Sequence, residues 1–249
     1  MLIQAIENKG KGKEALFLTD EIRNYQITTS LPADKIKYSR EYQVLAILKY
    51  AFGKEYACLH KGESPDLQDS EGNIGIEVTW GGSPIAEKIS GESVKYSHAQ
   101  TPAEREKCLR VIRKNGGDRD EVSTSYPVET VESEKVCISN VLRKKIRKAN
   151  NYHERYQRIG LAIMLDIPLI FFSDLKWGEW LAEENKGSFD FIVLTHWSGV
   201  DSYDFLTKEY SSHRISRDDM DSLKKLARMT AEGIISDDSS VWNFGEVEC

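Results

Sequence analysis

The sequence predicts an α/β fold, and three segments carry that prediction. Ser39 is followed by apolar residues at helical spacing up to Phe52 and then by Gly53, which is typical of an N-capped helix with a glycine stop. Residues 74–79 alternate apolar with non-apolar side chains, which is the period of a strand with one face in the core. Residues 136–158 repeat apolar side chains at steps of three and four, so they predict a second helix.

The other expected elements complete an α-β-β-β-α-β series with one further strand, over about residues 39–197. Strands are expected near residues 56–60, 66–68, 74–80, 161–165 and 189–195. Two more helices are expected at 102–114, where Thr101 can act as the cap, and at 217–233, which follows Ser216.

We interpret the whole chain, residues 1–249, as one elaborated domain. The polar segment 81–134 is expected to be an insertion, either a substrate-contacting excursion or, by default, a loop with one helix. Residues 198–249 are expected to form a helical C-terminal extension. The first 37 or so residues have no clear role beyond a possible strand at 15–18 and a helix-breaking Leu31-Pro32.

Two acidic side chains lie on segments that the sequence predicts to be a hairpin. Asp66 stands in Glu63-Ser64-Pro65-Asp66-Leu67, Glu77 stands in Ile76-Glu77-Val78-Thr79, and a turn composition at 69–73 separates them. The alternation predicts that Glu77 faces away from the core. Mg²⁺ prefers carboxylate oxygens, so the pair predicts a divalent-metal site. The alternative is an ordinary turn Asp and an ordinary exposed strand Glu.

This pair resembles the signature of the PD-(D/E)XK nuclease superfamily, which is Pro-Asp on one strand and acidic-x-Lys on the next. Pro65-Asp66 and Glu77-Val78-Thr79 match, except that Thr79 stands in place of the lysine. The resemblance implies a restriction-endonuclease-like αβββαβ core with a mixed central sheet flanked by helices. It also implies that Asp66 and Glu77 hold Mg²⁺ or Mn²⁺ and that Glu41 assists them. Without the resemblance, Glu41 is an acid in the first turn of a helix, where it favours the helix dipole.

The predicted helix at 136–158 carries a lysine inside its apolar stripe. Lys145 interrupts the stripe formed by Ile138, Leu142, Ala149, Tyr152 and Tyr156. An inward lysine reaches water or meets an acid, since it is costly to bury unpaired. Some members of the superfamily supply their lysine from this helix, so the resemblance implies Lys145 first and Lys148 second as the catalytic lysine. The alternative is a solvated basic helix.

The distribution of charge agrees with a nucleic-acid partner better than the net charge of −6 does. From Arg143 to Arg158, seven Lys or Arg residues stand against the single acid Glu154, while the tail after Ala231 is acidic. A basic helix beside an acidic metal pair can hold a phosphate backbone, which is the charge pattern of a nuclease.

Several other classes are not indicated by the sequence. The four cysteines form no Cys-x-x-Cys pair, which argues against structural zinc, and no nucleotide-binding glycine motif occurs. The longest apolar run, from Leu161 to Phe172, is broken by Asp166 and Pro168, so it predicts a buried strand and not a membrane span. No signal-peptide pattern opens the chain. We therefore expect a cytoplasmic protein without a membrane partner.

The leading hypothesis is a metal-dependent endonuclease that hydrolyses phosphodiester bonds, with DNA the first expectation and RNA the second. The alternative is a catalytically degenerate protein of the same fold that binds nucleic acid or a protein. A homodimer or a defence-system partner fits either hypothesis, and the sequence does not decide between them. The aromatic residues of the second half, including Trp177, Trp180 and Trp197, are expected to pack in the core more than to stack on bases.

Overall fold

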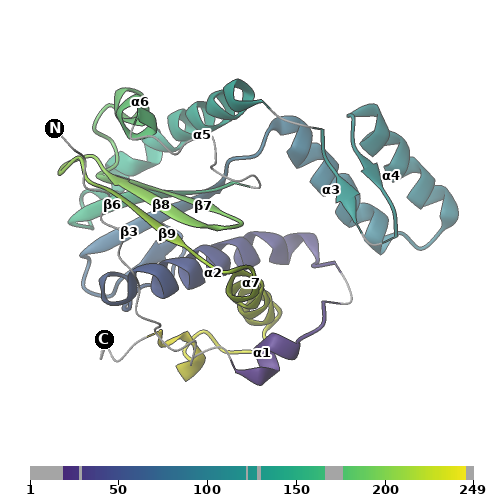
Figure 1. The fold of residues 1–249 in the computed structure, drawn as a ribbon, viewed down its shortest axis with the longest axis horizontal. Coiled ribbons are helices and arrows are strands. Elements are labelled where there is room, and N and C mark those ends of the chain that lie inside the picture. Colours follow the sequence, from purple (N-terminus) through teal and green to yellow (C-terminus); the bar gives the residue numbers. More distant parts are fainter. Residues whose placement is uncertain (1–18, 28–29, 122, 128–129, 166–175, 245–249) are drawn as a thin grey trace.

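A mixed β-sheet with helices on both faces forms the body of the protein (Figure 1). The computed structural model describes residues 19–27, 30–121, 123–127, 130–165 and 176–244. Within these residues the large sheet has seven strands in the order β1-β2-β3-β6-β7-β8-β9. The predicted α/β class, with a mixed central sheet flanked by helices, is confirmed.

The centre of the sheet is parallel and its two edges are antiparallel. Strands β3, β6 and β7 run parallel, and the other neighbours pair antiparallel. Their bounds are β1 (His60–Lys61), β2 (Leu67–Gln68), β3 (Ile74–Trp80), β6 (Arg158–Met164), β7 (Phe191–His196), β8 (Gly199–Asp204) and β9 (Tyr210–Arg214). The first expected strand, near 56–60, is therefore shorter and later, because residues 53–58 form helical and turn structure instead.

Two hydrophobic clusters occupy the two faces of the sheet. Helices α2 (Ala33–Phe52) and α7 (Arg217–Glu232) cover one face, and the short helices α1 (Asp20–Asn24) and η3 (Ser240–Trp242) contribute buried residues to the same cluster. A short 3₁₀ helix, η1 (Gly53–Glu55), follows α2 directly. Helices α5 (Val131–Tyr152) and α6 (Lys176–Asn185) cover the other face. Figure 1 shows these two helical layers below and above the strands.

Helix α2 starts earlier than predicted. It begins at Ala33, directly after Pro32, so Ser39 lies inside the helix and is not its cap. Glu41 consequently lies in the interior of α2 and not in its first turn. The predicted stop at Gly53 is correct, and this glycine has a φ of 58°, a conformation that residues with a Cβ avoid.

Both faces of β3 are buried, which corrects the expectation that Glu77 lies outside the core. The alternation is present, because Ile76 and Val78 face α2 within one cluster. Glu77 points to the opposite face, but α5 covers that face, and only 1% of the residue is exposed. Alternation predicted the face correctly, whereas the expectation that this face lies outside the core was wrong.

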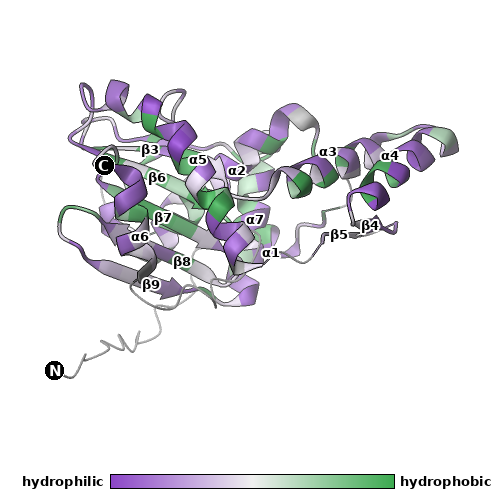
Figure 2. Ribbon diagram, turned by 90° about the horizontal axis from the view of Figure 1, so that it is seen from above, coloured by the Kyte–Doolittle hydropathy of each residue, from purple (hydrophilic) through white to green (hydrophobic). Residues whose placement is uncertain are grey.

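The segment 81–134 forms a lobe of helices and a small hairpin in place of the expected loop. It contains α3 (Pro84–His98), α4 (Pro102–Lys114), β4 (Asp118–Arg119) and β5 (Thr124–Ser125), followed by the first turn of α5. The predicted α4 has its predicted cap, because Thr101 and Glu104 form a capping box. The lobe projects from one end of the sheet in both orientations (Figures 1 and 2).

The C-terminal segment 198–249 begins with two strands and is not purely helical. Strands β8 and β9 extend the sheet, and α7 then occupies its predicted position, with Ser216 as N-cap and Gly233 in the left-handed conformation after its last turn. Trp177 packs in the core as expected, but 47% of Trp197 is exposed, so the packing prediction for Trp197 is wrong. The possible strand at 15–18 lies outside the described residues.

In the described part of the chain, the helices are too short or too polar to cross a lipid bilayer.

Candidate functional site

The hairpin of β2 and β3 brings Asp66 and Glu77 together. Leu67 pairs with Ile76 in this antiparallel ladder, so the next step of the register sets Asp66 opposite Glu77. The Asp66 Oδ2 atom accepts a hydrogen bond from the backbone N–H of Val78 at 2.8 Å. This bond fixes the Asp66 carboxylate against β3, and both acids are almost completely buried.

Gly75 allows the Pro65-Asp66 segment to lie close to the sheet. A Cβ atom on Gly75 would lie 2.8 Å from Cγ of Pro65 and 3.0 Å from the ring of Tyr156. Any larger residue at this position would therefore push Pro65 outward, and Asp66 with it.

Three donors from α5 converge on the Glu77 carboxylate. Lys145 Nζ and Lys148 Nζ donate to Oε1 at 2.6 and 2.7 Å, and the Tyr152 hydroxyl donates to Oε2 at 2.7 Å. Burial raises the pKa of Glu77, but the hydrogen bonds from Lys145, Lys148 and Tyr152 outweigh it and hold the pKa below its ordinary value. Burial and the contact with Glu77 raise the pKa of Tyr152 to about 12.

The spacing of α5 explains why these donors meet one acid. Residues 145, 148 and 152 are three and four apart, so they lie on one face of the helix. Ile138, Leu142, Ala149 and Tyr152 of the predicted stripe are buried, which turns this face toward β3. Helix α5 begins five residues earlier than predicted and ends at Tyr152, so Tyr156 is buried but lies after the helix. The expectation that Lys145 meets an acid is confirmed, and Lys148 bonds to the same oxygen from a more exposed position.

A second ionic group forms where Glu41 of α2 approaches Asp66. Lys37 Nζ lies 3.1 Å from Glu41 Oε1 and 3.4 Å from Asp66 Oδ1, and Lys61 Nζ lies 3.5 Å from Glu41 Oε2. Glu41 is 2% exposed, whereas 69% of the Lys37 side chain is exposed. Burial and the charge of Asp66 raise the pKa of Glu41 above its ordinary value, despite the opposing effect of Lys37.

The structure brings together the three acids and the two helix lysines that the sequence predicted for the site. The sequence did not predict that Lys37 and Lys61 would contact these acids. Lys37 and Glu41 are four residues apart on one helix, a spacing that could have predicted their ion pair. Lys61 carried no comparable signal, because its contact with Glu41 depends on how β1 packs beside α2. The role of Tyr152 as a donor to Glu77 was also missed, since its place in the apolar stripe predicted packing alone.

A cavity of about 410 Å³ opens beside the Glu41 and Lys37 pair. It lies between α2, the carboxyl end of β3 and α3, and Thr79, Trp80 and Arg40 line it together with that pair. The guanidinium carbon of Arg40 lies 4.8 Å from the centre of the Trp80 ring, a cation–π contact. A ligand in this cavity would lie next to the buried Glu41 carboxylate, between cationic and aromatic side chains.

The residues fit a hydrated divalent ion at two carboxylates. In the described residues, no three His, Cys, Asp or Glu side chains cluster closely enough to hold a metal ion. Mg²⁺, however, is often held by one or two carboxylates, with water and phosphate oxygens completing its ligands. Glu41 Oε1 is buried and lacks a hydrogen-bond partner among the described residues, apart from the ion pair with Lys37. A buried carboxylate oxygen that is paired with an exposed ammonium group and lies beside a second carboxylate is a suitable position for such an ion.

Comparison of the chain with family models, with curated proteins and with solved structures gives no match.

Proposed function

We propose that the protein is a metal-dependent nuclease of the PD-(D/E)XK kind, which hydrolyses phosphodiester bonds, with DNA the first expected substrate and RNA the second. One observation carries the proposal: Lys145 of α5 donates to Glu77 at 2.6 Å, beside an Asp66 that is anchored to the same strand. A lysine from the helix thereby reaches the acid whose own strand has Thr79 where the superfamily has its lysine. The element order α2, β1, β2, β3, α5, β6 supports a restriction-endonuclease-like core.

The acids and the lysines would have different roles. Asp66 would hold Mg²⁺ with Glu41, in place of the Glu77 first expected, because Glu77 already accepts hydrogen bonds from Lys145 and Lys148. The ion would supply positive charge for the phosphate and make a water molecule more acidic. Lys145 holds a positive charge and several N–H donors beside the acids, which can stabilise negative charge on a phosphate oxygen. Lys148 shares this position from the solvent side, and Tyr152 keeps the Glu77 carboxylate in its orientation.

The second candidate is a protein of this fold that binds nucleic acid without cleaving it. One observation favours it: Lys145 and Lys148 both donate to Glu77 itself, so this carboxylate is already neutralised within the protein. A site in which the acid and the lysines satisfy one another has less need of a metal ion. The two candidates differ in whether divalent ions change what the protein does to its substrate.

A cleavage assay with matched variants separates the candidates. Purified protein is incubated with plasmid DNA, single-stranded DNA or RNA in Mg²⁺, Mn²⁺ or EDTA. We expect cleavage only with a divalent ion, and its loss in Asp66→Asn and Lys145→Met. The control is Lys54→Met, which removes an exposed lysine outside the basic run of α5. Circular dichroism verifies that each variant folds. Binding that survives in EDTA without cleavage in any condition would instead favour the second candidate.

A further inference from the structure

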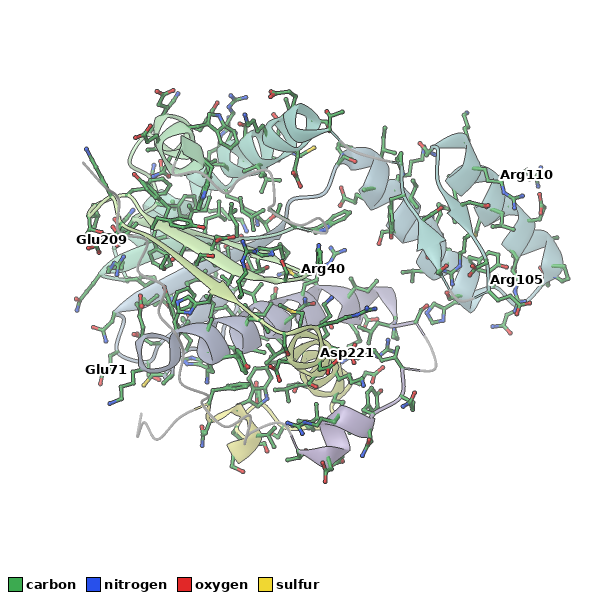
Figure 3. The ribbon with its side chains drawn as sticks, viewed as in Figure 1. Arg40, Glu71, Arg105, Arg110, Glu209 and Asp221 are labelled. Carbon is green, nitrogen blue, oxygen red and sulfur yellow. The ribbon has the colours of Figure 1, made fainter. Side chains whose placement is uncertain are left out.

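A second cavity lies at the carboxyl ends of the parallel strands, next to the proposed catalytic site. It measures about 320 Å³, and its floor includes the ends of β6 and β7 at Met164 and His196. In open α/β sheets the carboxyl ends of parallel strands are where ligands commonly bind. Figure 3 shows the labelled Arg40 side chain at this end of the sheet, the end that faces the lobe.

The chemistry of its walls suits one nucleotide. Trp80 and Trp197 offer aromatic faces, Arg40 and Lys224 offer positive charge from α2 and α7, and Gln43 offers an amide. No Asp or Glu occurs among its described lining residues. Base stacking on an aromatic ring together with a cation for the phosphate is how proteins hold unpaired nucleotides without reading their sequence.

The backbone at Trp197 is held in place, although the Trp197 side chain contributes to neither hydrophobic cluster of the sheet. His196 pairs with Gly199, so Trp197 and Ser198 form a two-residue turn between β7 and β8. The His196 ring is hydrogen-bonded with Ser198 Oγ at 3.0 Å and with Asp201 Oδ2 at 2.9 Å, which stiffens this turn from below. The turn thus presents a half-exposed indole on a fixed backbone, which lowers the entropy cost of stacking.

The two cavities share a wall. Arg40 and Trp80 line both this cavity and the one that contains Glu41 and Lys37. A strand whose phosphate lies at the carboxylates can therefore place its next nucleotide across the Arg40–Trp80 pair and against Trp197. We propose that this cavity is a flanking subsite for an unpaired nucleotide of the nucleic acid, with the base stacked on Trp197 and its phosphate near Lys224. This inference rests on the proposed function.

The test measures binding and not cleavage. Fluorescence anisotropy in EDTA compares a labelled single-stranded oligodeoxythymidine with a blunt duplex of the same length. Trp197→Ala should weaken single-strand binding roughly 5- to 150-fold, the loss of one stacked base, and Trp197→Phe should recover most of it. Lys224→Ala should weaken binding several-fold and reduce the salt slope by about 1.

The controls use neighbours that face elsewhere. Lys225→Ala removes the next lysine of α7, which pairs with Asp221 at 3.0 Å and lies outside the cavity. Leu206→Ala removes another exposed apolar side chain, in the turn between β8 and β9. Both should bind like the wild type, and thermal unfolding should be unchanged in Trp197→Ala because the indole is outside the clusters.

Three outcomes overturn different parts of the inference. Wild-type affinity in Trp197→Ala and Lys224→Ala would remove the flanking subsite and leave the proposed function standing. An equal loss for duplex and single strand would show that Trp197 does not hold an unpaired base. A wild-type protein that binds neither oligonucleotide, in EDTA or with Ca²⁺ in place of Mg²⁺, would overturn the subsite, whereas the cleavage assay with Mg²⁺ decides the proposed function separately.

Discussion

Glu77 carries a charge at a position that solvent barely reaches. A buried carboxylate costs several kcal/mol in lost hydration, so it stays ionised only where other groups replace its water. Here its two oxygens receive three donors, two of them cationic. Their effect on the pKa of Glu77 exceeds the effect of burial, and the pKa is lowered. The charge on Glu77 therefore depends on Lys145 and Lys148, and mutation can remove each lysine separately.

We predict that Lys145→Met destabilises the protein more than Lys148→Met. The Lys145 side chain is 21% exposed and that of Lys148 is 56% exposed, so water can replace Lys148 more easily. We expect losses in the free energy of unfolding of about 1–3 kcal/mol for Lys145→Met and at most about 1 kcal/mol for Lys148→Met. The double variant should lose more than the sum, because Glu77 then has no cation. Urea unfolding measures all three, with Lys144→Met as a near-neutral control.

The difference in stability between the wild type and Lys145→Met should depend on pH in a defined direction. An acid with a lowered pKa stabilises the folded state above its ordinary pKa, and this contribution is lost as the pH falls through the folded value. The wild type and Lys145→Met should therefore differ fully at neutral pH and converge in acid, where Glu77 is protonated in both. A difference that stayed constant down to the acid limit would mean that Lys145 acts through packing and not through the charge of Glu77.

Lys37 is the readily displaced cation of the second ionic group. Its ammonium lies between Glu41 and Asp66, while most of its side chain is in solvent. We predict that Lys37→Met lowers stability by about 1 kcal/mol in EDTA, because two buried acids then repel each other. Mg²⁺ should raise the melting temperature of Lys37→Met more than that of the wild type, since the ion no longer competes with an ammonium group. Equal shifts in both proteins would contradict competition at this position.

Glu41→Gln should raise the stability of the protein in EDTA, whereas Lys37→Met should lower it. The pKa of Glu41 is raised, so its ionised form opposes folding above the folded pKa, and this penalty disappears as the pH falls. Glu41→Gln should therefore raise the melting temperature at neutral pH without metal, and its advantage should vanish in acid. It should also lose the stabilisation by Mg²⁺. A melting temperature below that of the wild type in EDTA would mean that the pairs with Lys37 and Lys61 outweigh burial.

At the scale of single elements, the sequence predicts best where local signals agree. The bounds of β3 match the prediction, and α4 and α7 start after their predicted caps because Thr101 and Ser216 each satisfy a backbone N–H of the first turn. The inward position of Lys145 followed from helical spacing alone. Each of these depends on residues within about one or two turns of each other.

The structural features that the sequence did not predict depend on packing between distant segments. Alternation in β3 could set the face of Glu77 but could not reveal that α5 covers it. Strands β8 and β9 contain many polar residues, such as Ser202 and Ser211, whose hydroxyls bond to each other across the ladder. Helix α3 was overlooked although Ser83 caps it, because Gly91 interrupts a sparse apolar stripe. Only the folded arrangement supplies the partners of these residues.

Gly91 lies in the interior of α3, where glycine is unfavourable, and it lines the cavity beside Glu41. A Cβ at this position meets no atom within 4 Å, so no contact of the free protein requires glycine. We predict that Gly91→Ala stabilises α3 by about 0.5–1 kcal/mol, seen as slower amide hydrogen exchange in this helix. Gly91→Phe should fold but weaken nucleic-acid binding by filling the cavity. Unchanged binding in Gly91→Phe would place the nucleic acid elsewhere.

At the scale of the whole molecule, the lobe and the sheet have separate hydrophobic interiors. The buried apolar residues of the lobe are Ala86, Ile89, Cys108 and Ile112, and none of them belongs to the two clusters of the sheet. The lobe nevertheless supplies one wall of the cavity beside Glu41, through α3. Motion of the lobe relative to the sheet would therefore open or close the entrance to the proposed catalytic site.

We predict that the lobe opens locally without unfolding the sheet. Ile112→Ala should cost about 2–5 kcal/mol within the lobe, because Ile112 is fully buried there. Hydrogen exchange followed by mass spectrometry should then show faster exchange in α3, α4 and the β4–β5 hairpin, and unchanged exchange in α5 and β6. Leu142→Ala, in the cluster between α5 and the sheet, should instead speed exchange throughout the sheet. If Ile112→Ala also accelerated exchange in β6, the lobe and the sheet would unfold as one cooperative unit, and the lobe could not open the site on its own.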